Sequence, residues 1–185
     1  SVTTLTLGGA TTIANAGGAN ADAGILLTGG SATIEGGDNA IVTGGTGGIV
    51  VRVDGASNTL TINADLQDPG QDGDFILNGE GTLEIGGLLS LDGTGDEISL
   101  LGSSTLVLGT GGNIQNGRNL KIGHDATLDL NGSSESFRDF RGGGTILNTS
   151  SDDITLGISR QGTFTGIINE TDSGKISLSY TGNQD

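Results

Sequence analysis

The chain has 185 residues, of which 37 are glycine, one is proline and none is cysteine, and its formal net charge is −15. Glycine is nearly three times as frequent as its usual share of about 7%, but the absence of a Gly-X-Y period excludes collagen, and the absence of cysteine excludes a disulfide scaffold. The negative charge repels nucleic-acid phosphates and anionic lipid headgroups, so we expect neither nucleic acid nor a membrane as a partner.

Short segments that alternate apolar and polar residues, separated by Gly, Asn, Asp and Ser, predict strands and turns along the chain. In the N-terminal part, strands are expected at residues 5–7, 11–13, 25–28, 32–35, 40–43 and 49–53. These form two rungs that are less regular than the rungs from residue 56 onward. Hydrophobic residues make up 32% of the chain and aromatic residues only 3%, which indicates a thin, aliphatic core.

From residue 56 the strands recur at a fixed spacing, which is the sequence signature of a repeat architecture. The first series is Leu60, Leu83, Leu106 and Leu128, at steps of 23, 23 and 22 residues; the second is Leu77, Leu100 and Ile122; the third is Leu91, Ile114 and Phe137. Each period of about 23 residues therefore predicts three strands and three corners.

Strands that repeat without folding back as hairpins place each strand beside its equivalent one period later. We therefore expect a single all-β domain over residues 1–185, a parallel β-helix with three strands per rung, about 22 to 25 residues per rung and seven to eight rungs. The predicted inward columns are Leu60, Ile62, Leu83, Ile85, Leu106, Leu108, Leu128 and Leu130, together with the second and third series. An antiparallel sandwich is the competing fold, but it predicts no fixed period.

The C-terminal part continues the pattern, with strands expected at residues 136–140, 145–148, 153–158, 163–165, 166–168 and 175–180. It contains the runs Thr127-Leu-Asp-Leu-Asn-Gly132, Gly162-Thr-Phe-Thr-Gly-Ile-Ile168 and Gly174-Lys-Ile-Ser-Leu178. Through these runs, residues 120–182 resemble autotransporter passenger domains, in particular the segments that lead into the autotransporter-associated β-strand repeat. The resemblance implies a right-handed parallel β-helix and an extracellular location at the surface of a bacterial cell.

Two groups of polar residues are candidate sites. His124, the only histidine, precedes Asp125, so it could act as a base; a solvated corner residue is the simpler interpretation, and we expect no catalytic residue. The acidic segment with Asp65, Asp68, Asp72 and Asp74 could supply the oxygen ligands that calcium prefers. Calcium is therefore the one cofactor considered, and an acidic corner without metal is the alternative.

A calcium-dependent polysaccharide lyase is a second alternative, because some parallel β-helices combine aspartate-bound calcium with a basic residue. The basic candidates are Arg118, Lys121, Arg138 and Arg141. They follow the acidic segment by two to three rungs, or about 10 to 15 Å at the strand spacing. That separation argues against one shared site. A lateral face is the simpler place for Arg138, Arg141 and Arg160, where they pair with nearby aspartates or meet the acidic half of another copy.

The two ends of the chain are the remaining feature, since the terminal rungs of a solenoid expose open sheet edges unless a cap covers them. The residues at these ends are Leu5, Leu7, Ile176, Leu178 and Tyr180. Either the chain was cut from a longer solenoid, such as an adhesin that binds glycans or host surfaces, or its ends stack on other copies. We expect a non-enzymatic, stiff, acidic rod that builds or extends a surface fibre by head-to-tail stacking or strand addition.

Overall fold

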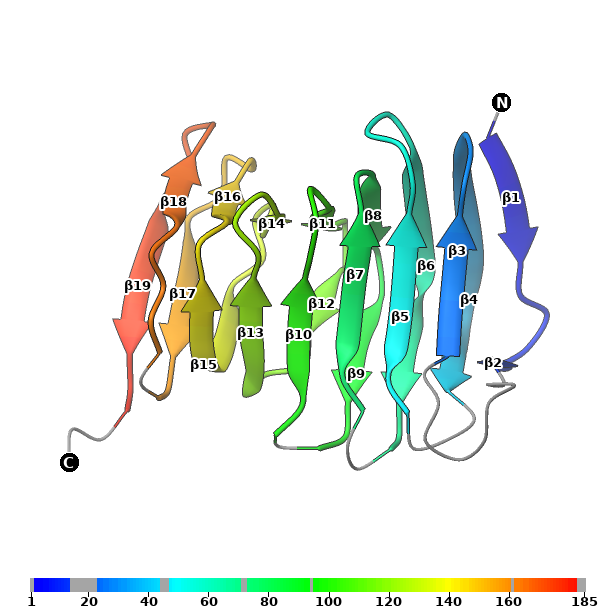
Figure 1. The fold of residues 1–185 in the computed structure, drawn as a ribbon, viewed down its shortest axis with the longest axis horizontal. Coiled ribbons are helices and arrows are strands. Elements are labelled where there is room, and N and C mark those ends of the chain that lie inside the picture. The colour runs from blue at the N-terminus through cyan, green and yellow to red at the C-terminus, as the bar shows by residue number, and fades with distance from the viewer. Residues whose placement is uncertain are drawn as a thin grey trace.

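The computed structural model describes residues 2–13, 23–43, 47–70, 73–93, 95–160 and 162–182. It forms a parallel β-solenoid of about six turns with about 23 residues per turn, coiled along the long axis of the molecule (Figure 1). Every strand pairing among the described residues is parallel. The predicted all-β parallel solenoid is thus confirmed. No helix in the described part of the chain is long and apolar enough to cross a membrane.

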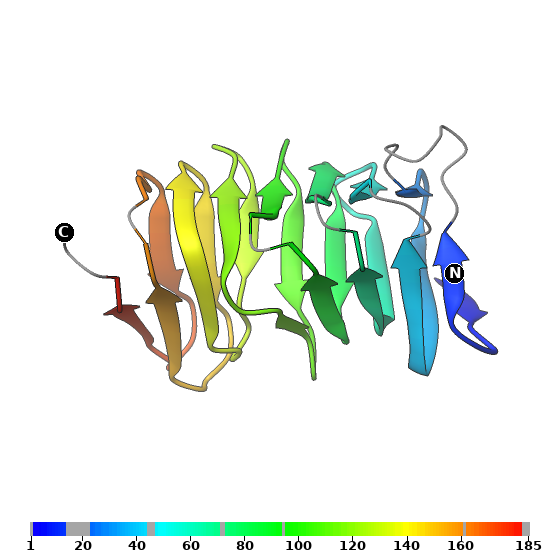
Figure 2. The same ribbon diagram turned by 90° about the horizontal axis from the view of Figure 1, so that it is seen from below.

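The strands form two sheets, which lie face to face along the coil (Figure 2). The main path of sheet A is β1 (Val2–Thr6), β4 (Ser31–Thr43), β6 (Thr59–Asp68), β8 (Thr82–Ile85), β11 (Thr105–Leu108), β14 (Thr127–Asp129), β16 (Thr145–Asn148) and β18 (Ile167–Glu170), with β2 (Thr11–Ile13), β9 (Leu88–Leu91) and β12 (Asn113–Ile114) beside it. Sheet B contains β3 (Ala23–Leu27), β5 (Ile49–Val53), β7 (Phe75–Gly79), β10 (Glu97–Leu100), β13 (Arg118–Ile122), β15 (Glu135–Gly142), β17 (Ile154–Ile158) and β19 (Ile176–Tyr180).

The structure has two sheets where the repeat suggested three strands around each rung. The expected strands at 32–35 and 40–43 are continuous in β4, and β6 alternates half-buried and buried residues over ten positions without a corner. Later rungs replace this extension by the short β9 and β12, and residues 163–165 contribute only a single bridge from Phe164 to Gly142. The third strand is therefore an extension of sheet A, and it shortens along the coil.

The length of a turn changes along the chain. In sheet A, Val2 pairs with Ser31, 29 residues later, whereas Leu60 pairs with Leu83 at a step of 23. Further on, the step from Thr127 in β14 to its partner in β16 is only 18 residues. Six rungs, from β4 with β5 to β16 with β17, have neighbours on both sides, and one rung at each end has a neighbour on one side only. The seven to eight expected rungs correspond to these six turns plus the terminal rungs.

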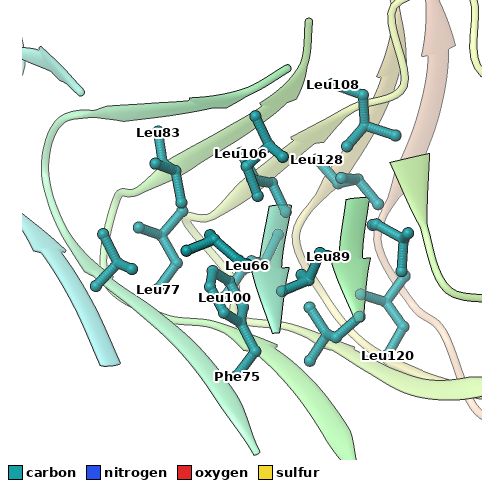
Figure 3. Packing of buried hydrophobic residues seen from close by; sticks show 14 of the residues in the cluster. Leu66, Phe75, Leu77, Leu83, Leu89, Leu100, Leu106, Leu108, Leu120 and Leu128 are labelled. Carbon is teal, nitrogen blue, oxygen red and sulfur yellow. The ribbon is translucent and has the colours of Figure 1, made fainter. Parts of the chain in front are cut away.

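The core is built as stacked aliphatic columns between the two sheets. All fourteen predicted core residues are at most 2% exposed. Leu60, Leu83, Leu106 and Leu128 are successive Cα partners in sheet A, and Leu77, Leu100 and Ile122 are successive partners in sheet B. Figure 3 shows leucines from both sheets pointing toward one another in the interior. The first two series are therefore genuine columns.

The third predicted column is wrong, although its three members are buried. The Cα partner of Ile114 is Leu89 and not Leu91, and Phe137 lies in sheet B beside Arg118. The reason is the corner after β11, which has two more residues than the equivalent corner after β8. Since two residues restore the same facing along a strand, the inserted corner keeps Ile114 buried while it changes its neighbour.

Candidate functional site

The candidate site is the pair of open sheet edges at the two ends of the solenoid. At one end β1 and β3 are paired on one side only, and at the other end the same holds for β18 and β19. These terminal rungs lie at opposite ends of the long axis (Figure 1). Unpaired backbone N–H and C=O groups on such an edge can accept a further strand.

Exposed apolar side chains gather at these same ends. The large hydrophobic residues that are exposed in the described structure are Leu5 at 56%, Leu26 at 61%, Ile167 at 62%, Leu178 at 61% and Tyr180 at 46%. Each of them belongs to one of the four terminal strands. Between the ends, the large aliphatic side chains of the inward columns are covered. The apolar surface of this acidic chain is therefore concentrated where the sheets are open.

Two of these residues are the last members of inward columns. Leu5 pairs with Ile34, which pairs with Ile62, a residue with no exposed surface. Leu178 pairs with Leu156, which also has no exposed surface. Both leucines point toward the core of the solenoid, and they are exposed because no further rung of the described chain covers them. They present the cut ends of the aliphatic columns.

The other end residues differ in orientation. Leu7 and Ile176 are half-buried and pack against the core, and Tyr180 continues the position of Ile158. The sequence pattern did not indicate Leu26 or Ile167. Leu26 pairs with the exposed Arg52, so it faces outward, and its exposure does not depend on the open edge.

The structure does not gather the four predicted calcium ligands. Asp68 is buried, and its Oδ1 accepts hydrogen bonds from Thr43 Oγ1 at 2.6 Å and from the backbone N–H of Gly70 at 3.0 Å. Asp65 lies on the opposite face of β6 and accepts from the backbone N–H of Leu88 at 2.8 Å.

The other two predicted ligands add no cluster. Asp74 is exposed and accepts from the backbone N–H of Glu97 at 2.8 Å, while Asp72 lies outside the described residues. Among the residues that the structure describes, no group of three or more His, Cys, Asp or Glu side chains could hold a metal ion. Calcium at this segment thus stays a prediction that the described geometry does not favour.

The remaining polar candidates are scattered. His124 is exposed, and its Nδ1 lies 2.7 Å from Asp125 Oδ1. Arg118 is buried, and its guanidinium donates to the carbonyl of Gly93 at 2.8 Å. Arg141 is paired with Glu97 across the outer face of sheet B. The exposed Lys121 lies beside Arg141 in the same sheet, and Arg138 lines a hollow with Arg160.

Comparison with known proteins gives no relative for this chain. No family model matches it, no curated protein matches it, and no solved structure matches it.

Proposed function

We propose that this chain is a non-enzymatic, extracellular structural protein, a stiff acidic rod that forms or extends a cell-surface fibre by stacking end to end with other copies. The observation that supports the proposal is the concentration of exposed aliphatic side chains on the four terminal strands, with Leu5 and Leu178 as uncovered members of inward columns. Stacking buries both residues and pairs the open backbone groups at once.

The strand lengths at the two ends are compatible with such a junction. β19 and β3 each have five residues, and β18 with four residues meets β1 with five. Since strands within each sheet are parallel, one copy translated along the axis presents parallel strands to the next. This is a heterologous, head-to-tail contact, which does not close on itself and therefore generates a filament.

The inward residues also constrain the register of the junction. In sheet A, β18 directs Ile168 inward, because its partner Ile146 is fully buried. Continuing the columns without a shift sets Ile168 beside Thr3 and Glu170 beside Leu5. A shift of two residues keeps every side chain on its face and sets Ile168 beside Leu5. We infer the shifted register, because it avoids burying the carboxylate of Glu170.

Electron microscopy and sedimentation of the purified chain test the proposal. The expected result is filaments with an axial repeat of about 35 to 40 Å, from eight strands at about 4.8 Å each. The variant Leu178→Asp should abolish the filaments, because it places a charge in the apolar contact. Leu26→Asp is the matched control, since Leu26 has the same 61% exposure but faces outward, and it should assemble like the wild type.

Monomers under all conditions, or filaments that survive Leu178→Asp, would overturn the stacking proposal. Monomers favour the alternative function, in which this solenoid is a segment of an autotransporter adhesin that binds host or surface glycans. The resemblance of residues 120–182 to passenger domains supports that alternative, as well as the extracellular location and the right-handed winding that right-handed parallel crossovers favour. A new unsaturated product from acidic polysaccharide and calcium would instead identify the lyase.

A further inference from the structure

A hollow of about 410 Å³ on the side of sheet B is lined by Gly117, Arg138, Ser159 and Arg160. These residues come from three successive rungs: Gly117 precedes β13, Arg138 lies in β15, and the other two follow β17. Two of the seven basic residues of a chain with net charge −15 therefore line one concave surface, and no carboxylate lines it.

The hollow lies at an irregularity in the sheet. Arg118 pairs with Phe137 and Leu120 pairs with Phe140, so β15 has one more residue than β13 between these two pairs. Such a β-bulge bends the strand and redirects the side chains at the extra position, here Arg138 and its neighbour. Bulges occur often beside binding and active sites for this reason.

The neighbouring strand leaves the sheet at the same level. The pairing of β17 with β15 ends at Ile158, and one further hydrogen bond joins the backbone N–H of Ser159 to the carbonyl of Phe137 at 3.0 Å. Arg160 follows immediately and is exposed. The bulge and the departing strand together bring two guanidinium groups, from neighbouring rungs, to the rim of one hollow.

We propose that this hollow binds an oxyanion, a carboxylate or sulfate group, carried by a small polar molecule up to the size of a monosaccharide. Guanidinium groups make charge-assisted, planar pairs with such groups, and the Ser159 hydroxyl supplies a neutral partner. The volume is within the range of about 300 to 1,000 Å³ for small-molecule sites, and it is far larger than the share of about 30 Å³ that one water occupies.

A second hollow on the same molecule offers an internal comparison. It has a volume of about 450 Å³ and is lined by Arg52 together with Asp54 and Glu80. The guanidinium of Arg52 already donates to Asp54 Oδ1 at 2.7 Å. Carboxylates at this second hollow repel an oxyanion, so Arg52 is the matched control for Arg160.

The experiment is a titration of the full chain, at low ionic strength, with sodium sulfate, with galacturonate and with neutral galactose, followed by NMR chemical shifts. We expect saturable binding of the anions, no binding of galactose, and weaker binding as salt is added. Arg160→Gln should lower the affinity at least tenfold, Arg160→Lys should restore part of it, and Arg52→Gln should leave it unchanged. Arg160 is exposed, so these variants should keep the fold.

Saturation by sulfate but not by galacturonate identifies a free inorganic ion as the source of the oxyanion, and saturation by both identifies an acidic sugar. The absence of saturable binding, or equal losses in the Arg160→Gln and Arg52→Gln variants, would overturn the proposal. These outcomes do not depend on end-to-end stacking, because the hollow lies on the side of the rod.

Discussion

The carboxylate of Glu135 in β15 accepts a hydrogen bond from the backbone N–H of Ile114 in β12, with Oε1 at 3.1 Å. The same oxygen accepts from Asn113 Nδ2 at 3.1 Å. In the described structure β12 ends the short ladder that runs from β6 through β9. The side chain of Glu135 therefore occupies the place of the next strand and satisfies an edge N–H that the shorter following rung leaves open.

This arrangement makes stability depend on pH. Glu135 is 3% exposed and its Oε2 has no hydrogen-bond partner, and burial raises the pKa of Glu135 to about 7 from 4.5. The folded protein therefore holds this proton more tightly than the unfolded chain. The resulting stabilisation is complete below pH 4.5 and is lost as pH rises to 7, by about 3 kcal/mol.

Glu135→Gln removes this titration and leaves the other ionisable groups in place. We expect the free energy of unfolding of the wild type, relative to that of the variant, to fall by about 3 kcal/mol between pH 4 and pH 8. Urea unfolding of both proteins at the two pH values measures the difference. A constant difference would show that Glu135 titrates normally.

Leu106→Asp should unfold the solenoid. Leu106 has no exposed surface and lies between Leu83 and Leu128 in its column, so the variant buries an unpaired charge between two aliphatic layers. Thr105→Asp, one residue away on the opposite face, should change stability by about 1 kcal/mol or less. Circular dichroism and urea unfolding compare the two, and a folded, equally stable Leu106→Asp variant would contradict the column.

Gly79→Ala should be strongly destabilising. Gly79 has a φ of 112°, and a Cβ there would lie 2.1 Å from the carbonyl oxygen of Val53 in the preceding rung. We expect a loss of more than about 2 kcal/mol, because both the backbone conformation and the close approach require glycine. Gly8→Ala is the control, since a Cβ at Gly8 has no atom within 4 Å. Equal midpoints in thermal unfolding for the two variants would contradict this role.

Arg118→Met should destabilise the fold through Asp96. Asp96 is 3% exposed and accepts from the backbone N–H of Gly93 at 2.6 Å. Burial raises its pKa, while that hydrogen bond and the charge of Arg118 oppose the rise. Without Arg118 the carboxylate keeps its desolvation penalty, so we expect a loss of about 3 kcal/mol. In a double-mutant cycle, Asp96→Asn should recover part of the loss, and additive losses would show that the two residues are not coupled.

The fold could be predicted from the sequence because the period of 23 residues and the facing of alternate residues come from the strands themselves. Leu60, Leu83 and Leu106 repeat in phase, and the structure pairs them. The corners are less constrained, so a two-residue insertion moved Ile114 beside Leu89 without any sign in the burial pattern.

Features that depend on neighbouring rungs could not be predicted. The hydrogen bond from Ile114 to Glu135 crosses 21 residues, and it exists because the ladder of β12 stops there. The bulge at Arg138 shows only when two strands are aligned. At the chain ends, Leu5 and Leu178 were predictable from strand alternation, whereas the outward direction of Leu26 required the register with Arg52.

The shortening of the turns gives the rod a taper. The first step in sheet A has 29 residues, whereas the last, from Thr145 to Ile167, has 22, which shortens the perimeter by about 20 Å of strand. At the wide end β2 extends the face of sheet A, and the described narrow end has only β18 and β19. When copies join wide end to narrow end, β2 therefore remains uncovered at each joint, so a fibre of this protein would carry a polar direction and a regularly spaced ledge along one side.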